Sequence, residues 1–214
     1  MKKLGKVLLS ILVVISIVIL LAFTAFNILF YKSPVVGVSM QPTFNIELEE
    51  GLSTAEYEAS NIKDKAYVYR FGKGKVGDVV LVQRGEGSSA RLIIKRIIAT
   101  GGQTVNIQEY EGKYYFYING ERLEEDYIKD YTKMVSCYTK FNTYKQEVLG
   151  LSQDQSITLA EDEIFVMGDN RGNSNDSSVF GPVKTSSVKG VVSFIVRYDQ
   201  NLIGYLFGLL FGNK

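Results

Sequence analysis

The sequence predicts a mainly β protein, with an N-terminal transmembrane helix followed by a largely antiparallel β-sheet domain that carries a smaller inserted lobe. Three observations predict this class. A long uncharged run stands near the N-terminus, short stretches rich in β-branched and aromatic residues follow it, and strands do not alternate regularly with amphipathic helices. The 214 residues fit one globular domain with attachments, since single domains usually have about 100–200 residues.

The uncharged run covers residues 8–30 and is 23 residues long. A helix rises about 1.5 Å per residue, so about 20 residues cross the roughly 30 Å of hydrocarbon in a bilayer. The apolar part of a cleaved secretory signal usually has about 7–15 residues. The length of this run therefore favours a retained anchor.

Charge around the anchor predicts its orientation. Residues 1–32 hold four lysines and no acid, whereas the remaining residues hold 20 basic and 23 acidic side chains. Lys2, Lys3 and Lys6 precede the apolar run and Lys32 follows it. The positive-inside rule then places residues 1–7 in the cytoplasm and the rest of the chain outside a single-pass cell membrane.

Short β-rich stretches continue along the outer part of the chain, which we expect to form one domain over residues 33–200. Turn residues separate them, and the Asn119-Gly120 pair predicts a hairpin. The strands expected from β-branched and aromatic residues are 78–83, 91–99, 104–108, 114–118, 163–167 and 190–197.

Less regular segments interrupt these strands. Residues 47–66 are acid-rich and predict a solvated insertion, and residues 126–156 are polar and rich in tyrosine. We expect the inserted lobe at about 104–160. An apolar tail covers 201–214. Its run 202–212 is too short to span a bilayer, and it predicts either a core strand or short packed helix, or a segment on the membrane surface.

Composition excludes several kinds of site. The chain has no histidine, so it can form neither a Ser-His-Asp triad nor a histidine-containing zinc site. Its one cysteine cannot form an intrachain disulfide, and a net charge of +1 does not indicate nucleic-acid binding. Residues 169–176 lack the spacing of a calcium loop. We therefore expect no metal, no cofactor and no nucleic-acid partner.

A serine activated by an amine is the chemistry that the sequence supports. Ser39 lies just beyond the anchor, and Lys95 sits in the stretch 92–98, which is otherwise apolar except for Arg96. On a strand, Lys95 shares a face with Ile93 and Ile97. Burial there would lower the pKa of the amine toward that of a useful base. The alternative is a lysine that extends from an edge strand to water.

Four motifs in the same order resemble the type I signal (leader) peptidases of Gram-positive bacteria, a family with a Ser/Lys dyad. The resemblance covers most of residues 1–198 but is poor in 45–66 and 126–160. The motifs are Ser39-Met40-Gln41-Pro42-Thr43, Gly77-Asp78-Val79-Val80, Lys95-Arg96-Ile97-Ile98 and residues 168–177.

The resemblance implies a membrane-bound serine endopeptidase that removes signal peptides from exported preproteins. Ser39 would be the nucleophile and Lys95 the general base. Ser174 would donate or accept a hydrogen bond at the Lys95 amine, and Asp169 would pair with Arg96. Asp176 and Arg171 complete the orienting and structural set.

Three departures from the family pattern affect these roles. Gly37 has no hydroxyl to serve as a second donor to the oxyanion, beside the Ser39 amide. Residues 99–103 read Ala-Thr-Gly-Gly-Gln where the family commonly has a G-x-P-G-D turn. Ser178 replaces the usual arginine, which leaves Asp176 without its expected partner.

The resemblance also implies that the substrate binds as an extended strand, with small side chains in shallow apolar pockets. The bilayer and exported preproteins are the expected partners. The expected substrate-binding residues are Pro34, Val35, Val36, Gly37, Val38, Met40, Leu92, Ile93 and Ile94.

Two other functions remain open on the sequence. One is a self-cleaving Ser/Lys protease, which shares the dyad but gives no reason for an N-terminal membrane span. The other is a non-catalytic, membrane-anchored module that binds or assembles surface proteins.

Overall fold

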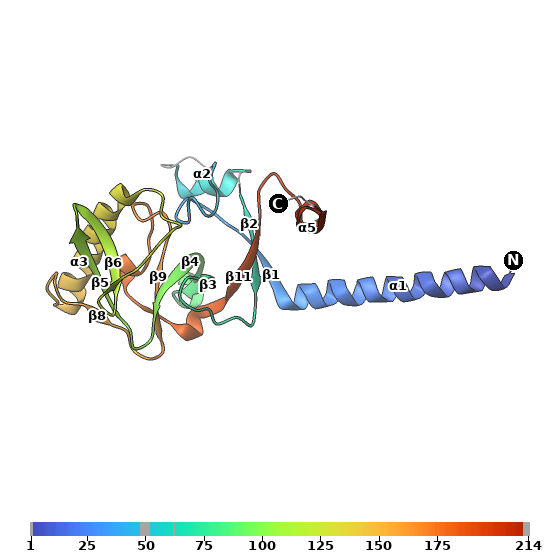
Figure 1. Cartoon of the computed structure of the whole chain (residues 1–214), viewed down its shortest axis with the longest axis horizontal. Coiled ribbons are helices and arrows are strands. Elements are labelled where there is room, and N and C mark those ends of the chain that lie inside the picture. Colours follow the sequence, from blue (N-terminus) through green and yellow to red (C-terminus); the bar gives the residue numbers. More distant parts are fainter. Residues whose placement is uncertain (1, 48–51, 62, 212–214) are drawn as a thin grey trace.

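The computed structural model describes residues 2–47, 52–61 and 63–211. A long helix, α1 (Lys2–Leu29), projects from a β-rich body (Figure 1). The other helices are α2 (Thr54–Ala59), α3 (Met134–Leu149), α4 (Ser177–Phe180) and α5 (Leu202–Phe211). The strands are β1 (Phe30–Pro34), β2 (Lys65–Tyr69), β3 (Val79–Arg84), β4 (Arg91–Thr100), β5 (Thr104–Tyr110), β6 (Lys113–Ile118), β7 (Glu121–Arg122), β8 (Ile157–Thr158), β9 (Glu163–Met167), β10 (Val183–Lys184) and β11 (Val188–Val196).

The strands of the described residues form two sheets. The larger has the order β1-β2-β11-β3-β4-β9-β10, and the smaller has the order β7-β6-β5-β8. Every strand pair in the described chain is antiparallel. The mainly antiparallel β-fold predicted from the sequence is therefore confirmed.

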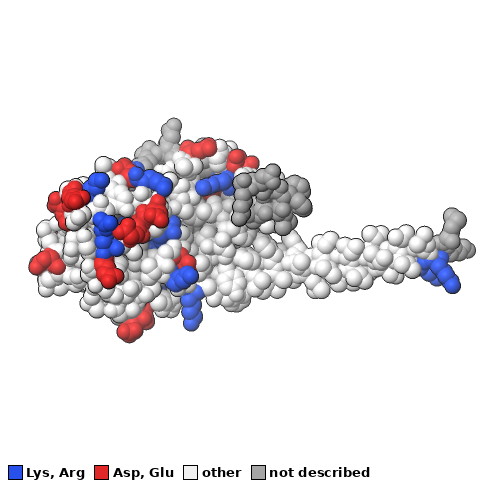
Figure 2. All heavy atoms as spheres, in the orientation of Figure 1, with Lys and Arg blue, Asp and Glu red and all other residues white. Residues whose placement is uncertain are grey.

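Helix α1 is apolar enough and long enough to cross a membrane, and the body buries none of its apolar window. In Figure 2 its shaft carries no charged side chain except near the N-terminus. The helix ends one residue before the end of the expected span, because Phe30 already pairs with Tyr69 in the larger sheet. Helix α1 thus continues into β1 without a linker.

Apolar clusters fill the body on both sides of the larger sheet. One packs residues 35–44, which follow β1, against the sheet through Val35, Met40 and Phe44. The opposite face holds Val80, Ile97 and Val166. A register shift in β4 after Ile97 turns the end of the strand toward a third cluster, under the smaller sheet.

Helix α3 covers the smaller sheet (Figure 1), and no helix was predicted from the sequence at this position. Its buried face includes Phe141 together with the polar Asn142 and Lys145. The Lys145 amine donates hydrogen bonds to Asn106 Oδ1 and to two backbone carbonyls. Polar residues on the inner face hid the helical pattern.

The solvated insertion expected at 47–66 was wrong at its C-terminal end. Asp64 is buried and accepts hydrogen bonds from Asn45, Arg197 and Tyr198, and β2 starts at Lys65. A short helix, α2, lies within the segment and starts with a capping box at Ser53. Residues 48–51 and 62 of this insertion, residue 1 of the cytoplasmic segment and residues 212–214 of the tail lie outside the described residues.

The contact between α3 and the smaller sheet should dominate the stability of the inserted lobe. Phe141 is fully buried between Phe116 and Phe165. We expect Phe141→Ala to lower the free energy of unfolding by about 3–5 kcal/mol, because it removes an aromatic ring and leaves a cavity. Circular dichroism of the detergent-solubilised chain in urea measures this. Val135→Ala, on the exposed face of α3, is the control, and equal unfolding midpoints would contradict the assignment.

Candidate active site

The loop after β1 holds Ser39 in a fixed position. Gly37 has φ +82°, a left-handed turn that favours glycine, and Val38 and Met40 on either side of Ser39 are buried. Asn170 fixes the loop from across the site. Its backbone N–H donates to the Ser39 carbonyl at 3.1 Å, and its side-chain amide donates to the Val38 carbonyl at 3.2 Å.

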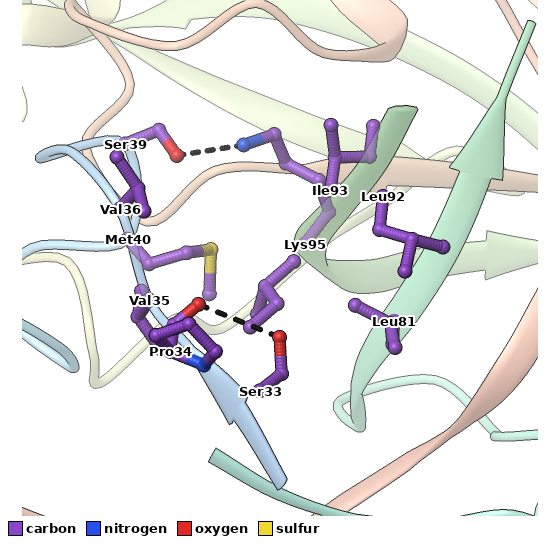
Figure 3. Close-up of a pocket in the computed structure, with 11 residues that line it drawn as sticks. Ser33, Pro34, Val35, Val36, Ser39, Met40, Leu81, Leu92, Ile93 and Lys95 are labelled. Atoms are coloured by element: carbon purple, nitrogen blue, oxygen red, sulfur yellow. Dashed lines mark hydrogen bonds between the residues drawn. The ribbon is translucent and has the colours of Figure 1, made fainter. Parts of the chain in front are cut away.

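Lys95 meets Ser39 from the middle of β4. Its Cα pairs with that of Val80 in β3, so strand pairing on β3 fixes its backbone. The side chain is 4% exposed, and the amine donates a hydrogen bond to Ser39 Oγ at 2.7 Å. Figure 3 shows the two side chains pointing toward each other from opposite sides of a groove. Lys95 is therefore buried and does not extend to water.

Burial makes this amine a weaker base than an ordinary lysine. Loss of water lowers the pKa of Lys95 from 10.5 to about 8, while the negative charges of Asp176 and Asp169 raise it and so limit the shift. At pH 7 about one amine in ten is then neutral, against fewer than one in a thousand for an exposed lysine. The neutral amine can accept a proton from a hydroxyl 2.7 Å away.

The next residue along β4 points to the other face and binds an acid, as the sequence predicted. Arg96 donates from Nε and Nη2 to the two carboxylate oxygens of Asp169, at 2.8 and 2.6 Å. The Thr43 hydroxyl also donates to Asp169, and the ring of Tyr127 lies 3.9 Å from the guanidinium carbon of Arg96. Asp169 thus ties the loop after β9 to β4 and to the Ser39 loop.

Asp176 finds partners where the sequence predicted none. It is fully buried and accepts hydrogen bonds from the Gly168 N–H at 2.9 Å and from the Ser178 hydroxyl at 2.7 Å. It also caps α4 by accepting from the Ser178 N–H. Ser178 stands where the family has an arginine, and its hydroxyl takes the place of that arginine as a partner of Asp176.

Ser174 does not make the expected hydrogen bond to Lys95. Among the described residues, its buried hydroxyl has no hydrogen-bond partner. It nevertheless lies beside the dyad, because a Cβ added to Gly168 would meet Ser174 Oγ at 2.3 Å and the Ser39 carbonyl oxygen at 2.4 Å. Only glycine fits at position 168, where the two loops touch.

Arg171 connects this loop to the inserted lobe. It is 1% exposed, donates to both oxygens of Glu125 and donates from Nε to the Gly168 carbonyl at 3.1 Å. Tyr127 donates to the same Glu125 at 2.6 Å. Glu125 and Tyr127 were not predicted from the sequence, since an acidic run between polar residues is typical of a solvated loop. Thr43 and Asn170 lie within the family motifs, but no role was predicted for them.

A groove of about 150 Å³ runs past the dyad between β1 and β4 (Figure 3). Most of the expected substrate-binding residues line it. Val38 and Gly37 are not among them, and a Cβ added to Gly37 would contact the Tyr57 ring. The lining residues are Ser33, Pro34, Val35, Val36, Ser39, Met40, Leu81, Leu92, Ile93, Ile94 and Lys95.

Both sides of the groove are sheet edges. Strand β1 is the first strand of its sheet, and β9 pairs with β4 only from Arg96 onward within the described residues. Residues 91–95 of β4 therefore have a free side. Backbone groups at two such edges can pair with an extended peptide placed between them.

The described residues contain no group of three or more histidine, cysteine, aspartate or glutamate side chains that could hold a metal ion. Cys137 lies in the third cluster, and burial raises the pKa of its thiol to about 12. A thiol with that pKa is a poor nucleophile near neutral pH.

Comparison with known proteins relates this arrangement to one family. The protein-family model described as "Signal peptidase, peptidase S26" matches residues 8–197. Signal peptidase I V of Bacillus subtilis (strain 168) is 30% identical over 84% of this chain and 92% of that protein. Signal peptidase I of Bacillus amyloliquefaciens is 31% identical over 85% of this chain and 83% of that protein. A crystal structure of a signal peptidase I from Enterococcus faecalis V583 is 27% identical, covers 56% of this chain and 97% of that chain, and has a TM-score of 0.37.

Removing the Lys95 amine should stabilise the fold at neutral pH. The lowered pKa of about 8 corresponds to about 3 kcal/mol of unfavourable free energy when the amine is protonated in both the folded and unfolded chain. We expect Lys95→Met to raise Tm at pH 7 by several degrees, at about 2–4 °C per kcal/mol. Thermal unfolding followed by circular dichroism measures this.

The pH dependence of that difference checks its cause. Between about pH 8 and 10.5 the unfolded chain binds a proton that the folded chain does not, so the wild-type protein gains stability as pH rises. The advantage of Lys95→Met should therefore shrink over this range. Lys189→Met, at an exposed position of β11, is the control. A Tm for Lys95→Met at or below that of the wild type at pH 7 would contradict the burial cost.

Proposed function

The chain belongs to the signal peptidase family, peptidase S26, and on that basis we propose that Ser39 and Lys95 are its catalytic dyad. It is a membrane-bound serine endopeptidase that removes signal peptides. The observation that carries the assignment of the dyad is the 2.7 Å hydrogen bond between the buried Lys95 amine and Ser39 Oγ. No histidine is available to replace Lys95 as the base.

The reaction follows from this contact. Neutral Lys95 removes the proton from Ser39 Oγ as that oxygen attacks the carbonyl carbon of the scissile bond. The resulting ammonium then donates its proton to the departing amine, and an acyl-enzyme ester remains on Ser39. Lys95, neutral again, deprotonates the water molecule that attacks the ester. The ammonium then donates this proton to Ser39 Oγ as the ester bond breaks, which regenerates the serine hydroxyl and the neutral amine.

The oxyanion of the tetrahedral intermediate needs hydrogen-bond donors. Among the described residues, none accepts a hydrogen bond from the Ser39 backbone N–H, which supports its role as one donor. Losing such a donor typically costs about 10²–10³ in rate. Gly37 carries no hydroxyl, so a second donor has to come from elsewhere.

The residues around the dyad are assigned positioning roles. Asp169 and Arg96 hold the loop after β9 against β4, and Arg171 holds the same loop against Glu125. We assign to Ser174 the role of orienting the Lys95 amine during turnover. Its hydroxyl is buried beside Gly168 and has no hydrogen-bond partner among the described residues, which supports this role. Asp176 limits the lowering of the Lys95 pKa.

We assign the groove as the binding site for the substrate residues that precede the cleaved bond. An extended peptide between β1 and β4 would pair with both free edges and bring its carbonyl to Ser39. The groove volume of about 150 Å³ is shared by several substrate residues, which supports small side chains near the cut. Exported preproteins are the substrates of this proposal, with the N-terminus of α1 in the cytoplasm and the groove outside.

The dyad should fail when either member changes. We expect Ser39→Ala, Lys95→Met and Lys95→Arg each to reduce cleavage of a purified preprotein by at least about 10³-fold. A guanidinium keeps its proton near neutral pH, so Lys95→Arg cannot act as the base. Gel-based cleavage assays in detergent micelles measure the rates, with exposed Ser136→Ala and Lys189→Arg as matched controls.

The same assay distinguishes the other two functions. Cleavage of the chain itself, with no cleavage of the preprotein, would favour a self-cleaving protease. Binding of the preprotein without cleavage by the wild-type chain would favour a non-catalytic module. Activity retained in Lys95→Met would refute the dyad.

The pH profile should report Lys95. We expect kcat/KM to rise with pH and to level off above about 8, as the amine loses its proton. Asp176→Asn removes a negative charge that raises the Lys95 pKa, so the midpoint should move to lower pH. Asp162→Asn, which changes an exposed acid just before β9, should leave this midpoint in place. A midpoint that is the same in Asp176→Asn and wild type would contradict the assignment of the base.

A further inference from the structure

Helix α5 has the composition of a buried helix. Its ten residues, Leu202–Phe211, include no charged side chain. A helix that is apolar all round normally lies inside a protein core or in a membrane. At about 1.5 Å per residue it is about 15 Å long, which is half the thickness of the hydrocarbon region. It cannot span a bilayer.

The body of the protein leaves apolar side chains exposed in the part of this helix whose side chains the structure describes, residues 202–206. Ile203 is 80% exposed and Leu206 is 42% exposed. Tyr205, which lies between them, packs inward, and its ring stacks on Phe194 of β11 at 5.4 Å. The first half of α5 is therefore held by Tyr205 and presents Ile203 and Leu206 outward.

An aromatic stack links α5 to the outer end of α1. Phe194, beneath Tyr205, lies 6.4 Å from Phe26 of α1 and 5.9 Å from Phe30, at the start of β1. Tyr67 lies against the other side of the stack, 4.6 Å from Phe194. Figure 1 shows α5 on the side of the body from which α1 projects. Helix α5 therefore lies beside the end of α1 that joins the body.

Other exposed aromatic residues lie near the end of α1 that joins the body. Tyr31, Tyr69 and Phe71 are each at least a third exposed, and the rings of Tyr69 and Phe71 are 5.8 Å apart. Amphipathic aromatic side chains concentrate where a membrane protein crosses from hydrocarbon to water. They mark the position at which α1 leaves the bilayer.

We propose that α5 lies in the surface of the bilayer, in the leaflet from which α1 emerges, and forms a second membrane contact of the chain. This inference rests on the assignment of α1 as the anchor. Lipid is the occupant because the inward stack of Phe26, Phe194 and Tyr205 holds α5 beside the outer end of α1, so that the exposed Ile203 and Leu206 lie where the apolar surface of α1 ends. A second contact beside the anchor restricts tilting of the body and fixes how the groove faces the membrane.

Fluorescence quenching by lipid tests the location of α5. The chain has no tryptophan, so Leu206→Trp introduces a single probe at an exposed position. We reconstitute the full chain in phosphatidylcholine vesicles that contain lipids brominated close to the headgroup or close to the chain end. We expect the emission to be blue-shifted, and to be quenched several-fold more strongly by the bromines near the headgroup.

Two further single-tryptophan variants provide the reference points. Tyr110→Trp, 49% exposed in the inserted lobe, should remain unquenched, and Leu12→Trp within α1 should be quenched by the deeper bromines. Adding Ile203→Asp to Leu206→Trp should reduce its quenching, while adding Val135→Asp on α3 should not. Both aspartates replace exposed side chains, so the fold should tolerate them.

Each contrary result has a separate meaning. Quenching of Leu206→Trp no stronger than that of Tyr110→Trp would overturn the proposal and leave the anchor intact. Loss of quenching at Leu12→Trp as well would overturn the anchor together with α5. A blue shift that disappears when protein is diluted in lipid would show that a second copy of the chain covers α5, which also overturns the proposal. None of these readouts depends on cleavage.

Discussion

The removal of water from the Lys95 amine is the constraint on which the site depends. An ammonium group in water would not give up its proton to serve as a base near neutral pH, and one buried without any compensating charge would cost several kcal/mol. The structure lies between these limits. Apolar residues of β4 and the Ser39 loop exclude water, while Asp169 and Asp176 act from a distance and keep the pKa at about 8. Stability is lost so that the amine can be neutral part of the time.

The acids near the dyad are committed to other partners. Arg96 neutralises Asp169, and neutral donors from Gly168 and Ser178 satisfy Asp176. Neither carboxylate forms a direct ion pair with Lys95, which would fix the amine in its charged form. The buried Glu125 and Arg171 neutralise each other at the boundary with the inserted lobe. The lobe therefore supports the loop without adding net charge beside the dyad.

The sequence was informative where a single chemical requirement restricts the residue. Ser39 and Lys95 stand in short motifs, and β4 and β9 are runs of β-branched residues whose burial follows from composition. It was uninformative where a contact depends on how distant segments meet. Glu125 binds a residue 46 positions away, and the direction of the Ser174 hydroxyl depends on the closure of two loops at Gly168. Helix α3 was not predicted because the polar Asn142 and Lys145 lie on its buried face and obscure the apolar periodicity. Strand β2 was not predicted because the acid-rich segment before it was expected to extend to residue 66.

The direct connection between α1 and β1 attaches the body to the helix and also fixes the distance between the end of α1 and the groove. The helix ends at Leu29, and Ser33 of β1 is the first residue that lines the groove, so three extended residues of at most about 10 Å separate the end of α1 from the start of the groove. Strand pairing with β2 keeps this distance from changing. With Ser39 as the proposed nucleophile, a substrate held in the same bilayer would reach it only when the extended segment of that substrate has a matching length. Selection of the cut bond would then be partly a measurement of distance, in addition to a fit of side chains.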